Sequence, residues 1–276
     1  MLGLIGLGLL PGTLARAQTT ILGSTGNYAV MAGSTVTING ATTITGNLGR
    51  ASRAGAGSLI LNGSEGGMTA QDQTDFTKAF NGLAAMTATV DLTGKILGTD
   101  AGAIVLAPGV YNFDTTAQLT GTLTLDAQNQ SNAVWVFQIG STFTTAASAR
   151  VVFTNLAANS VANDGLFWQV GTATTIGAGT TFEGNILGGS TFDFGAGATI
   201  DHGRALTGSG GTITLAGNTF DFIGVSSGYS GGLAFVGASN TITSIPEPST
   251  YALLAGALAL AAIVGRRRSF RAAIQA

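Results

Sequence analysis

Short alternations of apolar and polar residues, separated by glycine, run through the middle of the chain. In the stretch 122–125, which reads Thr-Leu-Thr-Leu, the leucines share one side of a strand and the threonines share the other. The same alternation predicts inward positions for Val36, Ile38, Phe143, Phe192, Phe194, Ile213 and Leu215. Segments this short, each with one apolar side, predict many short strands around a common apolar core.

Two internal echoes indicate that these strands repeat. Residues Gly177–Glu183 recur as Gly195–Asp201, a shift of 18, and after one inserted residue the match continues from 184–187 to 203–206. A second echo relates Val30–Thr37 to Phe137–Thr144. A period of about 18 to 20 residues, made of three short strands with glycine at the corners, is typical of a β-solenoid. At roughly 3.3 Å per residue, each strand would form one side of a triangular coil.

One stretch departs from the strand pattern. Between Thr69 and Thr89, large apolar side chains recur at helical spacing, at Phe76, Phe80, Leu83 and Met86. Thr69 is a suitable N-cap for such a helix. We therefore expect one amphipathic helix over about residues 69–89. Its apolar stripe needs a partner, either the side of the solenoid or a helix of another protein.

Composition narrows the possible functions. Glycine supplies 43 of the 276 residues, and charged residues make up only 9%, against about 25% in an average soluble domain. The absence of cysteine excludes disulfides and thiolate chemistry, and a single histidine, His202, excludes a histidine-cluster metal site. Residues 18–245 contain 6 basic and 12 acidic residues, a net charge of −6, which argues against nucleic-acid binding. We expect no metal, no cofactor and no nucleic-acid partner.

The beginning of the chain has the features of a secretory signal. A short apolar run over residues 2–10 is followed by Ala15-Arg16-Ala17, a small-x-small pattern that signal peptidase cleaves. The run is too short to span a bilayer comfortably. We therefore assign residues 1–17 to a signal peptide and expect the folded domain over residues 18–244.

The end of the chain, residues 245–276, has the features of a sorting signal. Pro246, Glu247 and Pro248 precede an apolar stretch over 251–264 and an arginine cluster at 266–268. An ordinary C-terminal anchor with positive-inside arginines would look similar. The order of the three parts resembles the PEP-CTERM signal, which exosortase handles in Gram-negative bacteria. The resemblance implies export, transient membrane anchoring, cleavage near the Pro-Glu-Pro, and release to the cell surface or extracellular matrix.

Four carboxylates fall at comparable places in successive coils, namely Glu183, Asp193, Asp201 and Asp221. Paired carboxylates can cleave glycosidic bonds. Each of these, however, occupies an outward position of its strand, and no lysine or arginine group accompanies them, so we interpret them as solvated surface groups. His202, next to Asp201, is interpreted as a solvated corner residue. No catalytic residue is predicted, and the protein is not expected to be an enzyme.

Threonine recurs at the outward positions that we assign to one repeating strand, at Thr35, Thr37, Thr122, Thr124, Thr142, Thr144, Thr175, Thr191, Thr212 and Thr214. Threonine suits exposed strand positions in any case. The functional alternative is a flat, rigid face whose hydroxyls and methyls are regularly spaced. Such a face can order water into an ice-like layer, because few charges hold water in competing geometries.

Several longer phrases are similar to the microbial ice-binding-protein family, at Gly23–Val30, Thr43–Gly49, Leu106–Tyr111, Leu119–Asp126, Ala133–Gly140 and Phe167–Gly171. The resemblance implies an all-β fold, a right-handed, discontinuous parallel β-solenoid of triangular section with one long helix packed alongside. It also implies ice binding through one flat face, without a cofactor. Residues 172–175, Thr-Ala-Thr-Thr, resemble the Thr-Ala/Gly-x-Thr motif of some members, which adds Thr172 to the expected face.

Two functions from different classes follow from these observations. The first is an exported, monomeric ice-binding protein that adsorbs to ice and restricts its growth or recrystallisation. The second is a structural protein or adhesin of the cell surface or matrix, to which the sorting signal also points.

Overall fold

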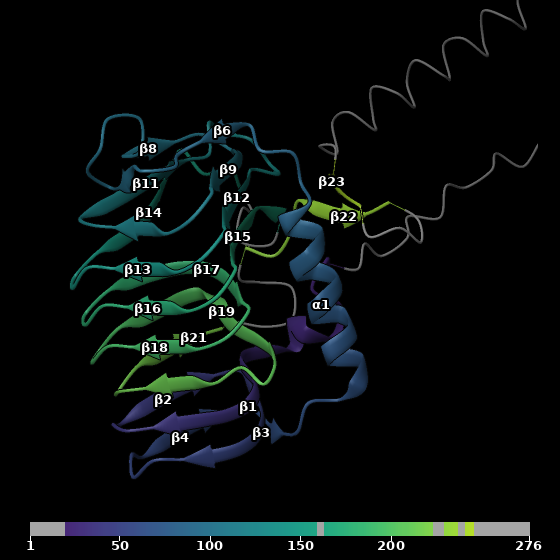
Figure 1. Ribbon diagram of the computed structural model, residues 1–276, viewed down its shortest axis with the longest axis vertical. Helices are drawn as coiled ribbons and strands as arrows, with labels where there is room; N and C mark the ends of the chain where they lie inside the picture. The colour runs from purple at the N-terminus through teal and green to yellow at the C-terminus, as the bar shows by residue number, and fades with distance from the viewer. Residues whose placement is uncertain (1–19, 159–162, 223–228, 237–240, 246–276) are drawn as a thin grey trace, which may run out of the picture.

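The computed structural model describes residues 20–158, 163–222, 229–236 and 241–245. The predicted signal peptide and, apart from Ile245, the predicted sorting signal lie outside the described residues. Within these residues, 21 strands form one sheet whose pairings are all parallel, and two further strands pair antiparallel. The large sheet is wound into stacked coils, which confirms the predicted β-solenoid (Figure 1).

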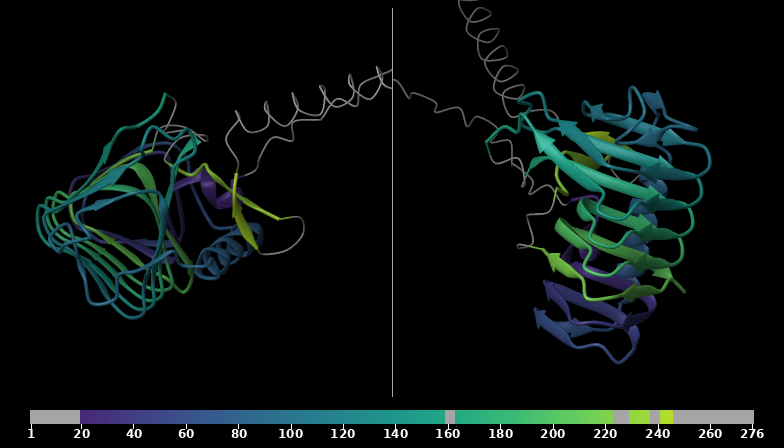
Figure 2. Two further views of the ribbon diagram at one scale, coloured as in Figure 1. Left: turned by 90° about the horizontal axis from the view of Figure 1, so that it is seen from above. Right: turned by 90° about the vertical axis from the view of Figure 1, so that its left-hand side faces the viewer.

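Each coil contributes one strand to each of three faces, and seen from above the coils enclose a roughly triangular core (Figure 2). The helix-covered face consists of β6 (Val90–Asp91), β9 (Gly109–Phe113), β12 (Val134–Ile139), β15 (Gly165–Val170), the second parts of β17 (Thr181–Gly188) and β19 (Thr199–Ser209), the first parts of β1 (Tyr28–Ile38) and β3 (Asn47–Ala54), and β5 (Glu65–Gly66).

The short strands make up a second side, named here the threonine face. It consists of β7 (Ile96–Leu97), β10 (Ala117–Leu119), β13 (Phe143–Thr145), β16 (Thr174–Ile176), β18 (Phe192–Phe194), β20 (Ile213–Leu215) and the second parts of β1 and β3.

The third side, named here the carboxylate face, completes each coil. It consists of β8 (Val105–Leu106), β11 (Thr122–Asp126), β14 (Arg150–Thr154), the first parts of β17 and β19, β21 (Thr219–Asp221), β2 (Thr42–Thr45) and β4 (Leu59–Asn62). Outside the coils lie the 3-10 helix η1 (Gly23–Asn27), the helix α1 (Ala70–Ala84), and the hairpin of β22 (Leu233–Phe235) and β23 (Ile242–Ser244).

The coils do not follow one another in chain order. The first strand, β1, pairs with the late strands β19 and β20 on one side and with β3 on the other. The chain therefore starts next to its last coil, continues to one end of the stack through β3 to β5, and returns along the side as α1 to start β6 at the other end (Figure 1). This discontinuity matches the expectation from the family resemblance.

The predicted repeat corresponds to neighbouring coils in register. Thr181 pairs with Thr199 and Glu183 with Asp201, which is the shift of 18. The inserted residue is His202, which adopts a left-handed conformation with φ 48° and bulges the second strand. At the next position Gly203 is required, because a Cβ there would collide with the carbonyl oxygen of Gly184 in the coil above.

The inward positions predicted from the alternation are buried in every case. Val36, Ile38, Phe143, Phe192, Phe194, Ile213 and Leu215 are at most 3% exposed. Parallel pairing places inward side chains of neighbouring coils on top of one another. Phe137, for example, pairs with Trp168, and their ring centroids lie 4.0 Å apart. Phe143, which lies in the same coil as Phe137, also stacks on Trp168, and their ring centroids are 5.1 Å apart. The interior is thus an apolar ladder that needs few charges, which accounts for the composition.

The helix α1 is shorter than the predicted range of residues 69–89. Thr69 caps it as expected, because the Thr69 hydroxyl accepts from the Asp72 backbone N–H while the Asp72 carboxylate accepts from the Thr69 N–H. The helix ends at Ala84, where the side-chain amide of Gln138 on β12 donates to the carbonyls of Leu83 and Met86, at 2.7 and 2.8 Å. Beyond this point the chain turns away into β6.

The apolar stripe of α1 packs on the side of the solenoid, which confirms the first of the two predicted partners. Phe76, Ala79 and Leu83 are buried in a second apolar cluster, together with outward residues of the helix-covered face such as Phe167 and Leu206. Phe80 and Met86 are partly buried against the same cluster. One face of the triangle is therefore unavailable to solvent along the length of the helix (Figure 2).

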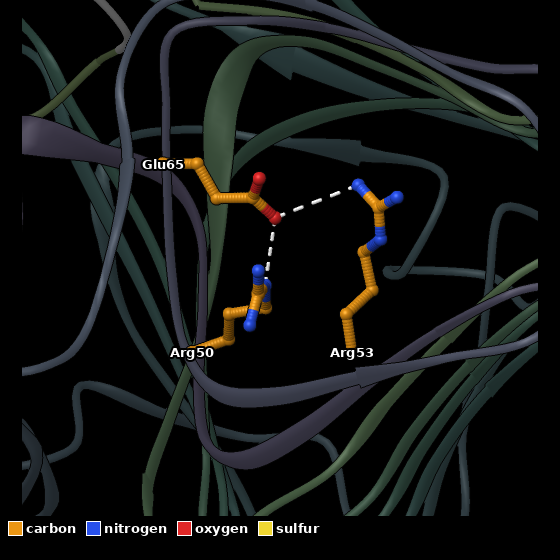
Figure 3. Close-up of polar contacts among 3 residues, drawn as sticks. All are labelled: Arg50, Arg53 and Glu65. Atoms are coloured by element: carbon orange, nitrogen blue, oxygen red, sulfur yellow. Dashed lines mark hydrogen bonds and ion pairs between the residues drawn. The ribbon is translucent and has the colours of Figure 1, made fainter.

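Charged side chains cover the end of the stack that carries β3 to β5. Arg53 pairs with the inward Val36, and Glu65 pairs with the inward Leu48. These two charged residues therefore occupy the next position in each row of inward side chains, just beyond the last apolar residue. Glu65 Oε1 lies 2.7 Å from Arg50 Nε and 3.6 Å from Arg53 Nη1 (Figure 3). Charges at an open sheet edge oppose pairing with another chain, so this cluster protects the end of the core.

Substitutions at inward positions should lower the free energy of unfolding much more than substitutions at outward positions. Replacing Phe143 or Ile213 with Ala should lower the free energy of unfolding by about 2–5 kcal/mol, because each leaves a cavity in the ladder. Replacing Thr144 or Thr214 with Ala should cost far less, since their side chains face outward. Thermal or denaturant melts measure the difference, and equal losses in the two classes would contradict the assignment of inward and outward positions.

The contact between Gln138 and the helix end should contribute measurably to stability. Gln138→Leu leaves the carbonyls of Leu83 and Met86 without their side-chain donor, which should cost about 1–3 kcal/mol. Gln169→Leu is the matched control, because Gln169 pairs in register with Gln138 and is similarly buried. In the described part of the chain its side chain makes no hydrogen bond to α1. Comparable losses in denaturant melts of both variants would show that the amide contact with the helix is unimportant.

Candidate functional site

The threonine face carries a central row of outward side chains, one from each of six stacked coils, which Ile96 and Ala54 continue at the two ends. The pairing register sets them side by side in the order Gln118, Thr144, Thr175, Asp193, Thr214 and Thr37. Each stands between two inward residues of its own strand, and four of the six are threonines. Because adjacent strands lie about 4.8 Å apart, the row is a regular line of small polar groups across the coils.

A second row lies two residues earlier in each coil, about 6.6 Å from the central row along the strands. It consists of Thr116, Thr142, Ala173, Thr191, Thr212, Thr35 and Ser52. Hydroxyls of neighbouring coils contact one another in this row. The Thr212 hydroxyl donates to Thr191 Oγ1 at 3.3 Å, and the Thr35 and Ser52 hydroxyl oxygens are 2.6 Å apart. The two rows form a lattice of hydroxyls and methyls on rigid backbone.

Small residues predominate on the other flank of the central row. In four coils the residue that follows the strand is small, namely Ala146, Gly177, Gly195 and Ala216, whereas Thr120 and Asn39 follow the strands of Gln118 and Thr37. At Gly177 no larger residue fits, because an added Cβ would lie 2.6 Å from the backbone of Ala146 in the neighbouring coil. Close approach of the backbones therefore restricts this position to glycine in the middle of the flank.

Nine of the eleven predicted threonines belong to this face, and two do not. Thr35, Thr37, Thr142, Thr144, Thr175, Thr191, Thr212 and Thr214 are in the two rows, and Thr172 is exposed at the edge, just before β16. Thr122 and Thr124 lie on the carboxylate face instead, where β11 pairs with β8 and β14. The prediction of one shared strand was wrong for these two, because outward residues alternate identically on every side of a triangular coil.

Three of the four predicted carboxylates do form a row, on the carboxylate face. Glu183, Asp201 and Asp221 pair in register in successive coils. Asp193 is not among them, since it lies in the central row of the threonine face. The fourth position of the predicted edge was therefore assigned to the wrong side, for the same reason as the two threonines.

Glu183 is outward but not freely solvated, contrary to the interpretation from sequence. Its side chain is only 16% exposed, and His202 Nδ1 lies 3.4 Å from its Oε2. Burial raises the pKa of Glu183, and the contact with this carboxylate raises the pKa of His202. The bulge that inserts His202 thus places its ring next to Glu183 of the neighbouring coil. Among the described residues, no group of three or more potential ligands is arranged to hold a metal ion.

Comparison with known proteins agrees with this geometry. An ice-binding-like family model matches residues 30–221, and a model of the PEP-CTERM protein-sorting motif matches residues 244–268. The chain belongs to the ice-binding-like family. An ice-binding protein of Nostoc sp. (strain HG1) is 42% identical over 205 residues, which cover 72% of this chain and 72% of that protein.

Solved structures of similar proteins confirm the solenoid fold of this ice-binding-like chain. The crystal structure of an ice-binding protein from an Antarctic biological consortium is 35% identical with a TM-score of 0.63, covering 79% of this chain and 95% of that one. The crystal structure of an ice-binding protein from the Antarctic ascomycete Antarctomyces psychrotrophicus is 33% identical in sequence, also with a TM-score of 0.63. The match covers 72% of this chain and 95% of that one.

The sorting motif marks this ice-binding-like chain as an exported protein. It begins within β23, where the described structure of the domain ends. In the described residues there is no helix of the length and apolarity that a membrane crossing requires.

Sequence reasoning missed five members of the two rows. Gln118, Ala173 and Ser52 were not considered, because none is a threonine, and Asp193 was grouped with the other carboxylates. Thr116 was not included among the outward threonines. The signal that could have found them is the inward partner: each central outward residue follows a buried residue of its own strand, such as Ala117 before Gln118 and Phe192 before Asp193.

Proposed function

We propose that this protein is an exported ice-binding protein that adsorbs to ice through the threonine face and thereby restrains ice growth or recrystallisation. The observation that carries the proposal is the pair of in-register rows of threonine and serine on a flat, open side of the solenoid. The similar proteins described as ice-binding proteins support the same function.

The physical basis is the sum of many weak contacts. Each threonine hydroxyl exchanges a hydrogen bond with liquid water for one with ordered water, so its net gain is small. Each methyl group beside it adds apolar surface that neighbouring waters must enclose. Adsorption then depends on how many such groups meet the crystal together, and hence on area and flatness. The parallel ladder and the stacked interior hold the groups in fixed positions, so little conformational entropy is lost on contact.

Two features favour the threonine face over the other sides. The helix-covered face is occupied by α1. The carboxylate face carries Arg150, Glu183, Asp201 and Asp221 in its two outward rows. Charged groups bind water strongly in geometries of their own, which opposes an ordered layer. Within the two rows of the threonine face, Asp193 is the single charged residue.

Bulky substitutions should identify the binding face. Replacing Thr142, Thr175 or Thr212 with Tyr should abolish most inhibition of ice recrystallisation, because the ring lifts the face off the crystal. The fold should persist, since these side chains point outward. Single changes of the same residues to Ser or Ala should do much less, because each hydroxyl contributes little by itself. Recrystallisation assays, with circular dichroism melts to verify folding, measure both effects.

The matched controls are Thr181→Tyr and Thr199→Tyr, which place the same ring at outward positions of the carboxylate face. These two substitutions should leave the inhibition of ice recrystallisation nearly unchanged. If these are the damaging substitutions, the carboxylate face binds ice. If neither set matters and the unaltered protein does not shape ice, the protein is a structural or adhesive component of the cell surface or matrix. That second function is favoured independently by the sorting motif, which directs proteins outward whatever they bind.

Both ends should be removed in the mature protein. We propose that signal peptidase cuts after Ala17 and that exosortase removes the chain after about Pro246, following transient anchoring in the membrane of a Gram-negative bacterium. Mass spectrometry of the native extracellular protein should then show a start near Gln18 and the loss of the apolar stretch. Secreted material that retains residues 251–264 would contradict processing of the sorting signal.

A further inference from the structure

Asp193 occupies the middle of the threonine face. It pairs with Thr175 on one side and with Thr214 on the other, so it continues the central row of outward side chains. Its side chain is exposed. In the described part of the chain, no hydrogen bond or ion pair engages its carboxylate, whereas the hydroxyls of Thr191 and Thr212 beside it contact each other. The carboxylate therefore meets solvent at the centre of the proposed ice-contacting surface.

The fold gives no reason for an aspartate at this position. The strand β18 is held by its inward neighbours Phe192 and Phe194, which are 0% and 3% exposed. Aspartate is depleted in strands, whereas threonine is enriched there. A threonine at 193 would fit between Thr175 and Thr214 as the same residue fits elsewhere in the row. The identity of this residue is therefore free to affect the surface without affecting the core.

A carboxylate changes what the face presents to water. It only accepts hydrogen bonds and carries a full charge, so it holds water more strongly and in another geometry than a hydroxyl does. Its position separates Thr144 and Thr175 from Thr214 and Thr37. We propose that Asp193 limits adsorption to ice by interrupting the central row of the threonine face. This inference rests on the proposed function and identifies the residue that sets its strength.

The chain contains a closely matched control for this proposal. Asp193 lies in the tetrapeptide Thr-Phe-Asp-Phe at 191–194, and the same tetrapeptide recurs at 219–222. The second copy places Asp221 at the equivalent outward position of the carboxylate face, paired with Asp201 and Thr45. Asp221→Thr therefore makes the same chemical change, with the same effect on net charge and in the same local sequence, on a different side of the solenoid.

The experiment compares Asp193→Thr, Asp193→Asn and Asp221→Thr in the full chain. The quantity measured is the lowest protein concentration that stops ice recrystallisation, with thermal melts to verify folding. Asp193→Thr should lower that concentration by about two- to fivefold, the size expected when weak contacts are added to an existing set. Asp193→Asn, which removes the charge but not the shape, should give part of the gain. Asp221→Thr should give none.

Three outcomes would overturn the proposal. If Asp193→Thr brings no gain while the unaltered protein is active and Thr175→Tyr is not, Asp193 is not limiting, although the threonine face still binds ice. If Asp193→Thr and Asp221→Thr improve activity equally, net charge rather than position is responsible. If neither the unaltered protein nor Asp193→Thr shapes ice, the proposed function fails together with this inference.

Discussion

The in-register stacking of inward side chains is the constraint on which the whole structure depends. Parallel pairing places each inward residue directly above its counterpart in the next coil, as Phe137 lies on Trp168 with the two rings stacked. Once this ladder is filled with large apolar groups, the backbone of every coil is fixed in position and height. The outward residues then repeat at the spacing of the strands, although they take no part in the core. A regular surface is thus a consequence of a regular interior.

A solenoid has three sides and two ends, and the chain treats each differently. The helix α1 buries one side in a second apolar cluster and is anchored at its last turn by Gln138. The Arg50, Arg53 and Glu65 cluster covers one end, where the core would otherwise present an open edge. These arrangements restrict contact with other molecules to the remaining sides. Of these, the threonine face carries fewer charged residues in its outward rows.

The two open sides show how similar sequences acquire different surface chemistry. The tetrapeptide Thr-Phe-Asp-Phe occurs once on each side, with its phenylalanines in the core and its aspartate outward. On the carboxylate face Asp221 continues a row of acids, and there Glu183 is partly buried beside the inserted His202. On the threonine face Asp193 interrupts a row of hydroxyls. The surroundings contributed by neighbouring coils, and not the local sequence, decide what each aspartate does.

The sequence by itself determined the periodic features of this protein. Alternation identified the inward residues correctly, from Val36 to Leu215, because the period of two in a strand is a local property. The echo of 18 residues predicted the pairing of Thr181 with Thr199, and Thr69 marked the start of α1. The Pro-Glu-Pro at 246–248 and its flanking parts identified the sorting signal, which depends on linear order alone.

Only the tertiary structure decided which side of the triangle each strand occupies. Thr122 and Thr144 look alike in sequence, since both are outward threonines beside inward apolar residues, and yet they lie on different faces. The end of α1 was likewise set from a distance, because its final carbonyls are satisfied by Gln138, 55 positions after Leu83. The place of β1 against β19 and β20 depends on pairing between residues far apart in the sequence, such as Val30 and Ala205. Local patterns fix whether a side chain points in or out, but the side it faces depends on where each coil turns and which coil stacks beside it.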